Sequence, residues 1–257
     1  MLWKILFFVL LAACVGILLV PAVLPRLLRR AGRGVGDVRR AGEELLTGKE
    51  VPGSPLARYE ATAGKEVEGK ILARCPLSNA PGLQARVGHI GARLAALAHR
   101  REIAYRFLVL EDPEPNAYSI PGGTVLISRT LLDLCGGDDH QLAGVLAHEV
   151  VHIDRRHAVR HLAAGAAART GLKLLTLGRG ALLGRAVGAL ESLMTHGYST
   201  DQEMEADRLG VQLGAAAGFD ARAYAFFLRS AFDRGFSVQG YFRAHPPIPD
   251  RLRNLGV

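Results

Sequence analysis

The chain has 257 residues, enough for one sizeable domain or two small ones, and 49% of them are hydrophobic. Its mean hydropathy of +0.15 favours a globular part with an attached membrane segment over a plain soluble domain. The net charge of +8 suggests nucleic acid or an anionic membrane surface as a partner, and three irregularly spaced cysteines exclude a disulfide framework and a Cys-x-x-Cys zinc site.

The first predicted element is a membrane-spanning helix. Residues 2–24 are apolar apart from Lys4 and are interrupted only by Pro21, and about 20 such residues cross a bilayer. Signal-peptide cleavage and lipidation at Cys14 are the alternatives. The apolar run continues well beyond Cys14, which favours an uncleaved transmembrane anchor at residues 1–25.

A basic linker rich in Gly and Pro is predicted at residues 26–60. Six arginines lie between positions 26 and 40, and the positive-inside rule places such a flank, and with it the main domain, on the cytoplasmic side. The charge rule is weak evidence for one short flank, so the side of the membrane stays open.

Residues 61–257 are predicted to form the main domain, α+β in class and mostly helical. Apolar residues at helical spacing predict helices over 83–100, 138–161, 201–217 and 221–234. Residues rich in β-forming side chains predict short strands over 103–110, 116–120 and 124–128, separated by Pro- and Gly-containing turns. We expect a small antiparallel sheet.

The segment from His148 to His152 has the pattern H-E-x-x-H. On a helix, residues four apart share one face, so both imidazoles can bind one zinc ion. Glu149 lies on the adjoining face, where it can act as general base toward water. The pattern alone is common in proteins, and an amphipathic helix with solvated histidines is the alternative interpretation.

A catalytic zinc site needs a third protein ligand. One class uses a histidine six residues after the second ligand, but Ala158 stands at that position. The other class uses a glutamate on a later helix, followed four residues on by an aspartate, and Glu203 and Asp207 fit this spacing. Asp207 is then expected to accept a hydrogen bond from a ligating imidazole, that of His148. The alternative is a solvated acidic helix start.

Three other polar residues near these motifs fall off the predicted ligand face. His157 and His161 lie five and nine residues after His152, and Glu205 points away from the face that Glu203 shares with Asp207. We expect both histidines to be solvated or to lie behind the ligands.

Together these residues resemble the integral-membrane gluzincin family that includes HtpX and the CAAX prenyl endopeptidase. Four blocks within residues 85–255 carry the resemblance: Asn116-Ala117-Tyr118 with Pro121-Gly122-Gly123; residues 142–149 continuing to His152 and Arg156-His157; Tyr198-Ser199 leading to Glu203 and Asp207; and His245-Pro246-Pro247 with Arg251-Leu252. The chain departs from the family pattern at Thr200 and Gln141. Because one span is predicted, the single-anchor bacterial branch matches best.

The resemblance implies a zincin-type fold, one Zn²⁺ per chain and hydrolysis of internal peptide bonds in proteins. Asn116, Ala117 and Tyr118 would lie on an edge strand that binds an extended peptide, with turn chemistry as the alternative for Asn116. His245 would stabilise the oxyanion or close the resting site; a surface-loop histidine is the alternative. The implied setting is protein quality control or processing at the bacterial inner membrane, with lipid contacted through the N-terminal helix.

Two rival functions are weighed against this one. A catalytically silent zinc-binding scaffold or chaperone would have lost Glu149 or a ligand, and all are present. A nucleic-acid binder would carry basic residues interleaved with aromatics, but aromatics make up 6% and the basic residues flank the anchor or lie in an apolar stretch. Residues 162–193 belong to that stretch and, as an interfacial helix or a cover, are placed to gate the metal site.

Overall fold

The computed structural model describes residues 54–161, 179–236 and 240–257. Residues 57–257 form one compact unit, and residues 1–56 are assigned to another. The predicted anchor at 1–25 lies outside the described residues, and within the described ranges no helix is long and apolar enough to cross a membrane. The division into anchor, linker and catalytic domain therefore stays a prediction.

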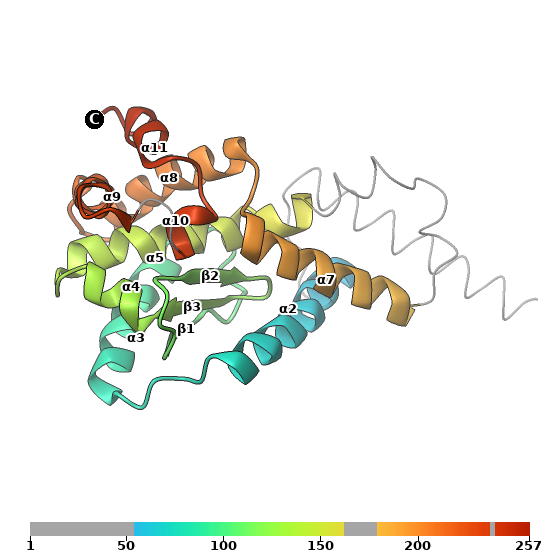
Figure 1. The fold of residues 1–257 in the computed structure, drawn as a ribbon. Helices are drawn as coiled ribbons and strands as arrows, with labels where there is room; N and C mark the ends of the chain where they lie inside the picture. The colour runs from blue at the N-terminus through green and yellow to red at the C-terminus, as the bar shows by residue number, and fades with distance from the viewer. Residues whose placement is uncertain (1–53, 162–178, 237–239) are drawn as a thin grey trace, which may run out of the picture. The chain divides into compact units, whose positions relative to one another are not determined.

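The described part of the chain is mostly helical with one small sheet (Figure 1). Its helices are α2 (Pro55–Arg74), α3 (Pro81–Ala95), α4 (Arg129–Leu134), α5 (Asp139–Asp154), α7 (Arg179–His196), α8 (Thr200–Ala216), α9 (Ala223–Asp233), α10 (Gly240–Arg243) and α11 (Ile248–Asn254). Its strands are β1 (Arg106–Leu110), β2 (Ala117–Ile120) and β3 (Thr124–Ser128). The three predicted strands and four predicted helices are all present, with shifted ends.

The sheet is mixed, so the prediction of an antiparallel sheet is wrong for β1. The strand order is β1-β3-β2, with β3 antiparallel to β2 and parallel to β1. A turn at Gly122 and Gly123, both with positive φ, joins β2 to β3 as a hairpin. The side-chain pattern of a strand does not encode its direction relative to its neighbours, so the chain's return to the far side of β3 could not be predicted.

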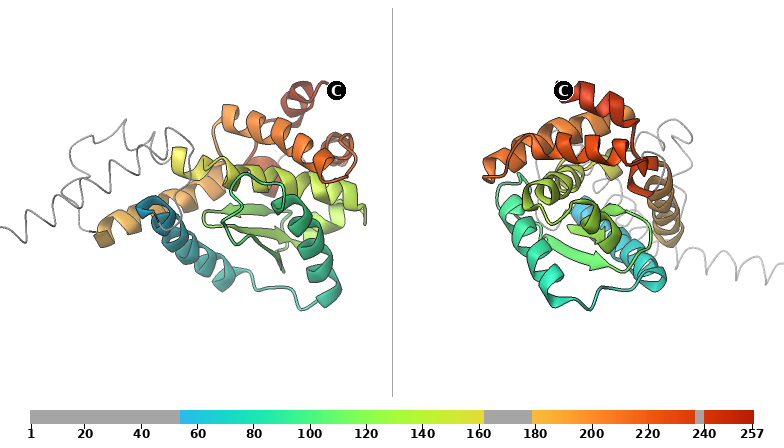
Figure 2. Two further views of the ribbon diagram at one scale, coloured as in Figure 1. Left: turned by 180° about the vertical axis from the view of Figure 1, so that it is seen from behind. Right: turned by 60° about the vertical axis from the view of Figure 1, so that its left-hand side comes forward.

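Two hydrophobic clusters cover the two faces of the sheet. On one face, Val109, Val125 and Ile127 pack with α3, α5 and the C-terminal helices. On the other, Leu110 and Leu126 pack with residues of α2 and α7, and Figure 2 shows these two helices from behind. Every residue of β3 is buried, as expected for a central strand covered on both faces.

Helix α5 lies between the sheet and helices α8 and α9 (Figure 1). Asp138 caps it as predicted, since its side chain accepts hydrogen bonds from the amides of His140 and Gln141. The prediction that this helix continues to His161 is wrong. It ends at Asp154, Arg156 adopts φ 54°, and helical structure resumes at His157. The Arg156 guanidinium lies 3.6 Å from the buried Glu60 carboxylate, a distant partner that local sequence does not reveal.

Helix α8 approaches α5 closely because Gly210 has no side chain at the crossing. A Cβ atom there would lie 3.0 Å from the backbone nitrogen of His148. Ser199 and Gln202 form a capping box that fixes the start of α8. The first turn of α8 is therefore held against the part of α5 that carries His148 and His152.

Candidate metal centre

The two histidines of the H-E-x-x-H pattern point their ring nitrogens at each other. Nε2 of His148 lies 3.0 Å from Nε2 of His152, and both side chains are buried. Glu203, from the first turn of α8, places Oε2 3.5 Å from Nε2 of His148 and Oε1 3.8 Å from Nε2 of His152. The three residues predicted as ligands are thus brought together from two helices.

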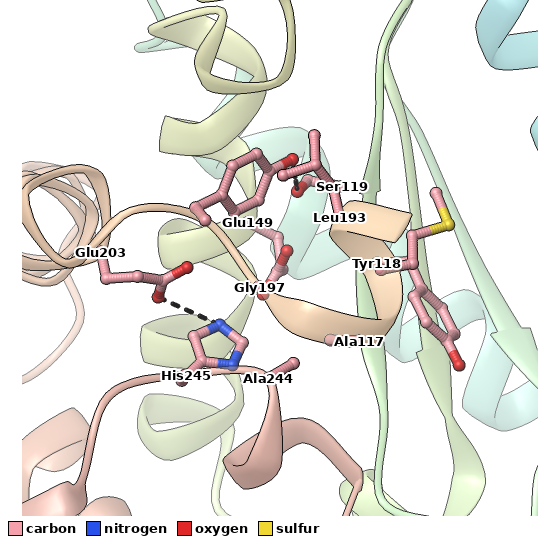
Figure 3. A pocket seen from close by; sticks show the side chains of 11 residues that line it. Ala117, Tyr118, Ser119, Glu149, Leu193, Gly197, Glu203, Ala244 and His245 are labelled. Atoms are coloured by element: carbon pink, nitrogen blue, oxygen red, sulfur yellow. Dashed lines mark hydrogen bonds and ion pairs between the residues drawn. The ribbon is translucent and has the colours of Figure 1, made fainter. Parts of the chain in front are cut away.

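His245 completes this cluster from the segment between α10 and α11. Its Nε2 lies 3.3 Å from Oε2 of Glu203 (Figure 3), and its Nδ1 donates to the carbonyl of Tyr241 over 2.6 Å. With Nδ1 holding the proton, the lone pair of Nε2 is directed at the cluster. Burial lowers the pKa of His245 to about 4, so the ring is neutral.

The donor set fits a metal ion. One nitrogen or oxygen atom from each of His148, His152, Glu203 and His245 lies within 4.8 Å of the others. Glu203 is fully buried, and among the described residues neither of its carboxylate oxygens has a hydrogen-bond partner. A buried carboxylate of this kind needs a compensating charge, and imidazole with carboxylate suits Zn²⁺.

Glu149 borders the cluster without joining it. Burial raises the pKa of its carboxyl to about 7, against a smaller opposing effect of His148. The side chain lines a cavity of about 30 Å³, large enough for water. Figure 3 shows Glu149, Glu203 and His245 on one side of β2, with Leu193 above them. Leu193 and Met194 of α7 also line this cavity. Leu193 is the last residue of the segment predicted to gate the site, and Met194 follows it.

Asp207 lies behind His148, as predicted. Its Oδ1 is 2.9 Å from Nδ1 of His148. Arg251 donates to the same carboxylate twice, from Nη2 over 2.6 Å and from Nε over 3.0 Å, and also to the hydroxyl of Tyr224. Burial raises the pKa of Asp207, but the Arg251 charge and these hydrogen bonds outweigh it and hold that pKa well below its usual range. Arg251 belongs to the fourth block of the family resemblance, but the sequence alone did not indicate this role.

The predicted substrate strand is β2, which lies next to the cavity and at one edge of the sheet that the described residues form. The amide of Ser128 donates to the carbonyl of Asn116 over 2.8 Å, so residues 116 and 118 face β3 while Ala117 and Ser119 direct their backbone groups outward. Ala117, Tyr118 and Ser119 all line the cavity, and the ring of Tyr118 projects away from Glu149 (Figure 3). The Asn116 side chain donates to Asp112 over 3.2 Å, which is turn chemistry.

Sequence reasoning missed two residues that contact this centre. Tyr198 stacks on His152 with ring centroids 4.1 Å apart and planes at 17°. Its hydroxyl lies 3.3 Å from that of Ser119. Tyr198 stands in one of the quoted blocks, so its presence near the site could have been inferred; nothing in the local sequence distinguishes Ser119.

Comparison with known proteins agrees with this geometry. The profile of Peptidase family M48 matches residues 81–256. The chain is 29% identical over 184 residues to the beta-barrel assembly-enhancing protease of Escherichia coli (strain K12), covering 67% of this chain and 36% of that protein. It is 31% identical over 192 residues to the putative beta-barrel assembly-enhancing protease of Vibrio cholerae, covering 69% and 39%.

A mitochondrial relative matches a similar share of the chain. The mitochondrial metalloendopeptidase OMA1 of Schizosaccharomyces pombe is 28% identical over 180 residues, covering 66% of this chain and 51% of that protein. The chain therefore spans about a third to a half of the length of these relatives.

Proposed function

The chain belongs to peptidase family M48, and from that premise we propose that it is a zinc-dependent metalloendopeptidase hydrolysing internal peptide bonds of proteins. One observation carries the proposal: His148, His152 and Glu203 converge from two helices on a buried point bordered by Glu149. The two kinds of relative that match, one bacterial and one mitochondrial, are both named as proteases.

In this proposal His148, His152 and Glu203 hold the zinc ion. When bound, zinc polarises the scissile carbonyl and makes water a stronger acid. Glu149 accepts the proton of the attacking water and passes it to the leaving amine. Its carboxyl, with a pKa raised to about 7, is suited to both steps.

Two roles are open to His245. It can donate a hydrogen bond to the developing oxyanion, or it can close the resting site. Its neutral ring, with Nε2 3.3 Å from Glu203, supports the second role in the conformation described. Asp207 fixes the orientation and tautomer of His148 in either case.

The proposed substrate is an extended protein segment that adds to the edge of β2 facing away from β3. The outward backbone groups of Ala117 and Ser119 would bind it. We further propose a single-pass inner-membrane protein, anchored through residues 1–25, that acts in quality control or processing of membrane-associated proteins. The names of the bacterial relatives, which refer to beta-barrel assembly, support a role near such assembly. No nucleic-acid partner is proposed.

The test uses the full chain in detergent with an unfolded protein as substrate. We expect zinc-dependent cleavage that falls by about 10²–10⁴-fold in Glu149→Gln, because a general base contributes that much. Both proteins should bind one zinc ion. Absence of bound zinc in the wild-type chain would contradict the proposal.

The same experiment separates the alternative of a silent zinc-binding scaffold. A scaffold would bind zinc and cleave nothing. His245→Ala distinguishes it from a self-blocked enzyme, because removing the fourth donor should release activity in a blocked enzyme and leave a scaffold inactive.

A further inference from the structure

The chain turns back on itself directly after α5 and places His157 against His152. Arg156, at φ 54°, makes the turn. The His157 side chain is fully buried, although its position five residues after His152 predicts a different face of a continuous helix. Its Nδ1 lies 2.9 Å from Nδ1 of His152, with the two rings nearly perpendicular at 79°.

Helix α8 holds His157 from two sides. Gln202 donates its side-chain amide to the backbone carbonyl of His157 over 3.0 Å. Glu205 places Oε2 3.4 Å from Nε2 of the His157 ring. Between these two residues in the sequence stands Glu203, so the first turns of α8 supply both a predicted metal ligand and the residues that fix His157.

The proton positions in this chain of contacts follow from its geometry. With a metal ion bound at Nε2 of His152, the Nδ1 of that ring would carry the hydrogen and donate it to Nδ1 of His157, 2.9 Å away. The remaining hydrogen of His157 is then on Nε2, which lies 3.4 Å from Oε2 of Glu205 without completing a hydrogen bond to it. His157 must be neutral for this arrangement, because its Nδ1 accepts the hydrogen bond while its Nε2 carries the hydrogen of the ring.

Glu205 supplies a negative charge at the outer end. Its side chain is 23% exposed, with Nε of Arg155 at 3.0 Å and Nη1 of Arg160 at 3.6 Å. The Glu205 carboxylate favours the Nε2–H tautomer of His157, because Nε2 is the ring nitrogen that faces it.

We infer that His157 and Glu205 are positioning residues for His152: a carboxylate–imidazole pair that fixes the tautomer of this ligand and strengthens its bond to the metal. The inference rests on the proposed function. It makes the two ligand histidines unequal, because Asp207 contacts His148 directly and is neutralised by the buried Arg251. His152 is instead coupled through a neutral ring to a carboxylate at the surface.

The first test compares His157→Leu with His157→Asn in the full chain in detergent. Leucine removes the acceptor for Nδ1 of His152, whereas the asparagine side-chain oxygen can take the place of Nδ1. Zinc affinity is measured by competition with a chelator, and the stability of the zinc-free protein by thermal unfolding. We expect His157→Leu to weaken zinc binding about 10–100-fold and His157→Asn to recover most of that loss.

The second test changes the surface carboxylate, where misfolding is not a concern. Glu205→Gln removes the charge, and Asp201→Asn removes an equal charge from an exposed position in the first turn of the same helix. We expect weaker zinc binding in Glu205→Gln and unchanged binding in Asp201→Asn. If His157→Leu does not fold, the comparison of Glu205→Gln with Asp201→Asn tests the inference by itself.

The outcomes separate the inference from the proposed function. A wild-type chain that binds no zinc would overturn the proposed function. A wild-type chain that binds zinc, with His157→Leu and Glu205→Gln binding it as tightly, would overturn the inference alone. Equal losses in the leucine and asparagine variants, matched by equal losses of zinc-free stability, would show that His157 acts by packing and would also overturn it.

Discussion

Arg251 is a fully buried guanidinium at the centre of a polar network. It donates to both oxygens of Asp207 and to Tyr224, and its guanidinium carbon lies 5.7 Å from the ring centroids of Tyr224 and Tyr241. Charges are rarely buried this deeply without a matched partner. Because the partner here also accepts from His148, the C-terminal helix α11 takes part in orienting a predicted metal ligand.

Replacing Arg251 with methionine should therefore destabilise the fold. The change leaves the Asp207 carboxylate buried without its charge partner, which costs about 3–5 kcal/mol when a buried pair is broken. Chemical denaturation of the zinc-free protein measures the loss. The control is Arg253→Met, two residues on, whose side chain is 76% exposed and should change stability by less than about 0.5 kcal/mol. Equal effects of the two variants would contradict the network's importance.

The pH dependence of stability should report the same carboxylate. The folded-state pKa of Asp207 lies below its unfolded value of about 3.9. Its contribution to stability is thus fully present above that unfolded value and is lost as pH falls toward the folded pKa. The gap in unfolding free energy between wild type and Asp207→Asn should be largest near pH 7 and shrink below about pH 4. A gap independent of pH would mean that Asp207 acts by hydrogen bonding alone.

Residue by residue, the sequence was most informative where spacing along one helix fixes geometry. His148 and His152 share a face of α5, and Glu203 shares one with Asp207, so their convergence needed only the pairing of two helices. His157 could not be placed, because a non-glycine residue at positive φ turns the chain before it. The role of Arg251 depends on a contact across 44 positions, which no local pattern encodes.

At the scale of elements, the crossing of α5 and α8 sets the spacing of the metal centre. Gly210→Ala would place a Cβ atom 3.0 Å from the His148 nitrogen and 3.2 Å from its Cα. Both are backbone atoms, so the helices must separate by a few tenths of an ångström. We expect a loss of about 1–3 kcal/mol, as in overpacked cores, together with weaker zinc binding, measured by denaturation and chelator competition.

Gly214 is the matched control on the same helix. A Cβ atom there would meet nothing within 4 Å, so Gly214→Ala should leave zinc binding unchanged and stabilise the helix by up to about 1 kcal/mol. If Gly210→Ala behaved like Gly214→Ala, the helix crossing would not control the centre.

The periodicity of apolar residues was sufficient to predict some helices and not others. The helices predicted at 201–217 and 221–234 match α8 and α9 within two residues, since both have clear caps or apolar faces. Helix α2 begins at Pro55, inside the range predicted as linker. Its helical pattern was missed because its apolar residues are sparse, and the residues that they pack against lie far away in the sequence. The direction of β1 relative to β3 could not be predicted, because the alternation of side chains along a strand reads the same for parallel and antiparallel pairing.

For the whole molecule, the proposed metal centre and the proposed membrane anchor lie in separate parts of the sequence. All proposed ligands lie within residues 81–256, the range matched by the family. The N-terminal apolar run lies well before that range. Zinc binding and membrane attachment can therefore be tested separately.

Removing residues 2–25 should release the protein from bacterial membranes without changing its zinc affinity. About 20 apolar residues span a bilayer, so the full chain should stay in the membrane pellet after alkaline extraction and the truncated chain should not. Leu10→Arg with Leu11→Arg is the matched control, because each central charge costs about 2.5–3.5 kcal/mol on insertion while the chain length is kept. If the truncated chain remained in the pellet, a second contact would be needed. The basic stretch from Arg169 to Arg185 would be the first segment to mutate, since four cations and no acid in an apolar sequence favour an anionic bilayer surface.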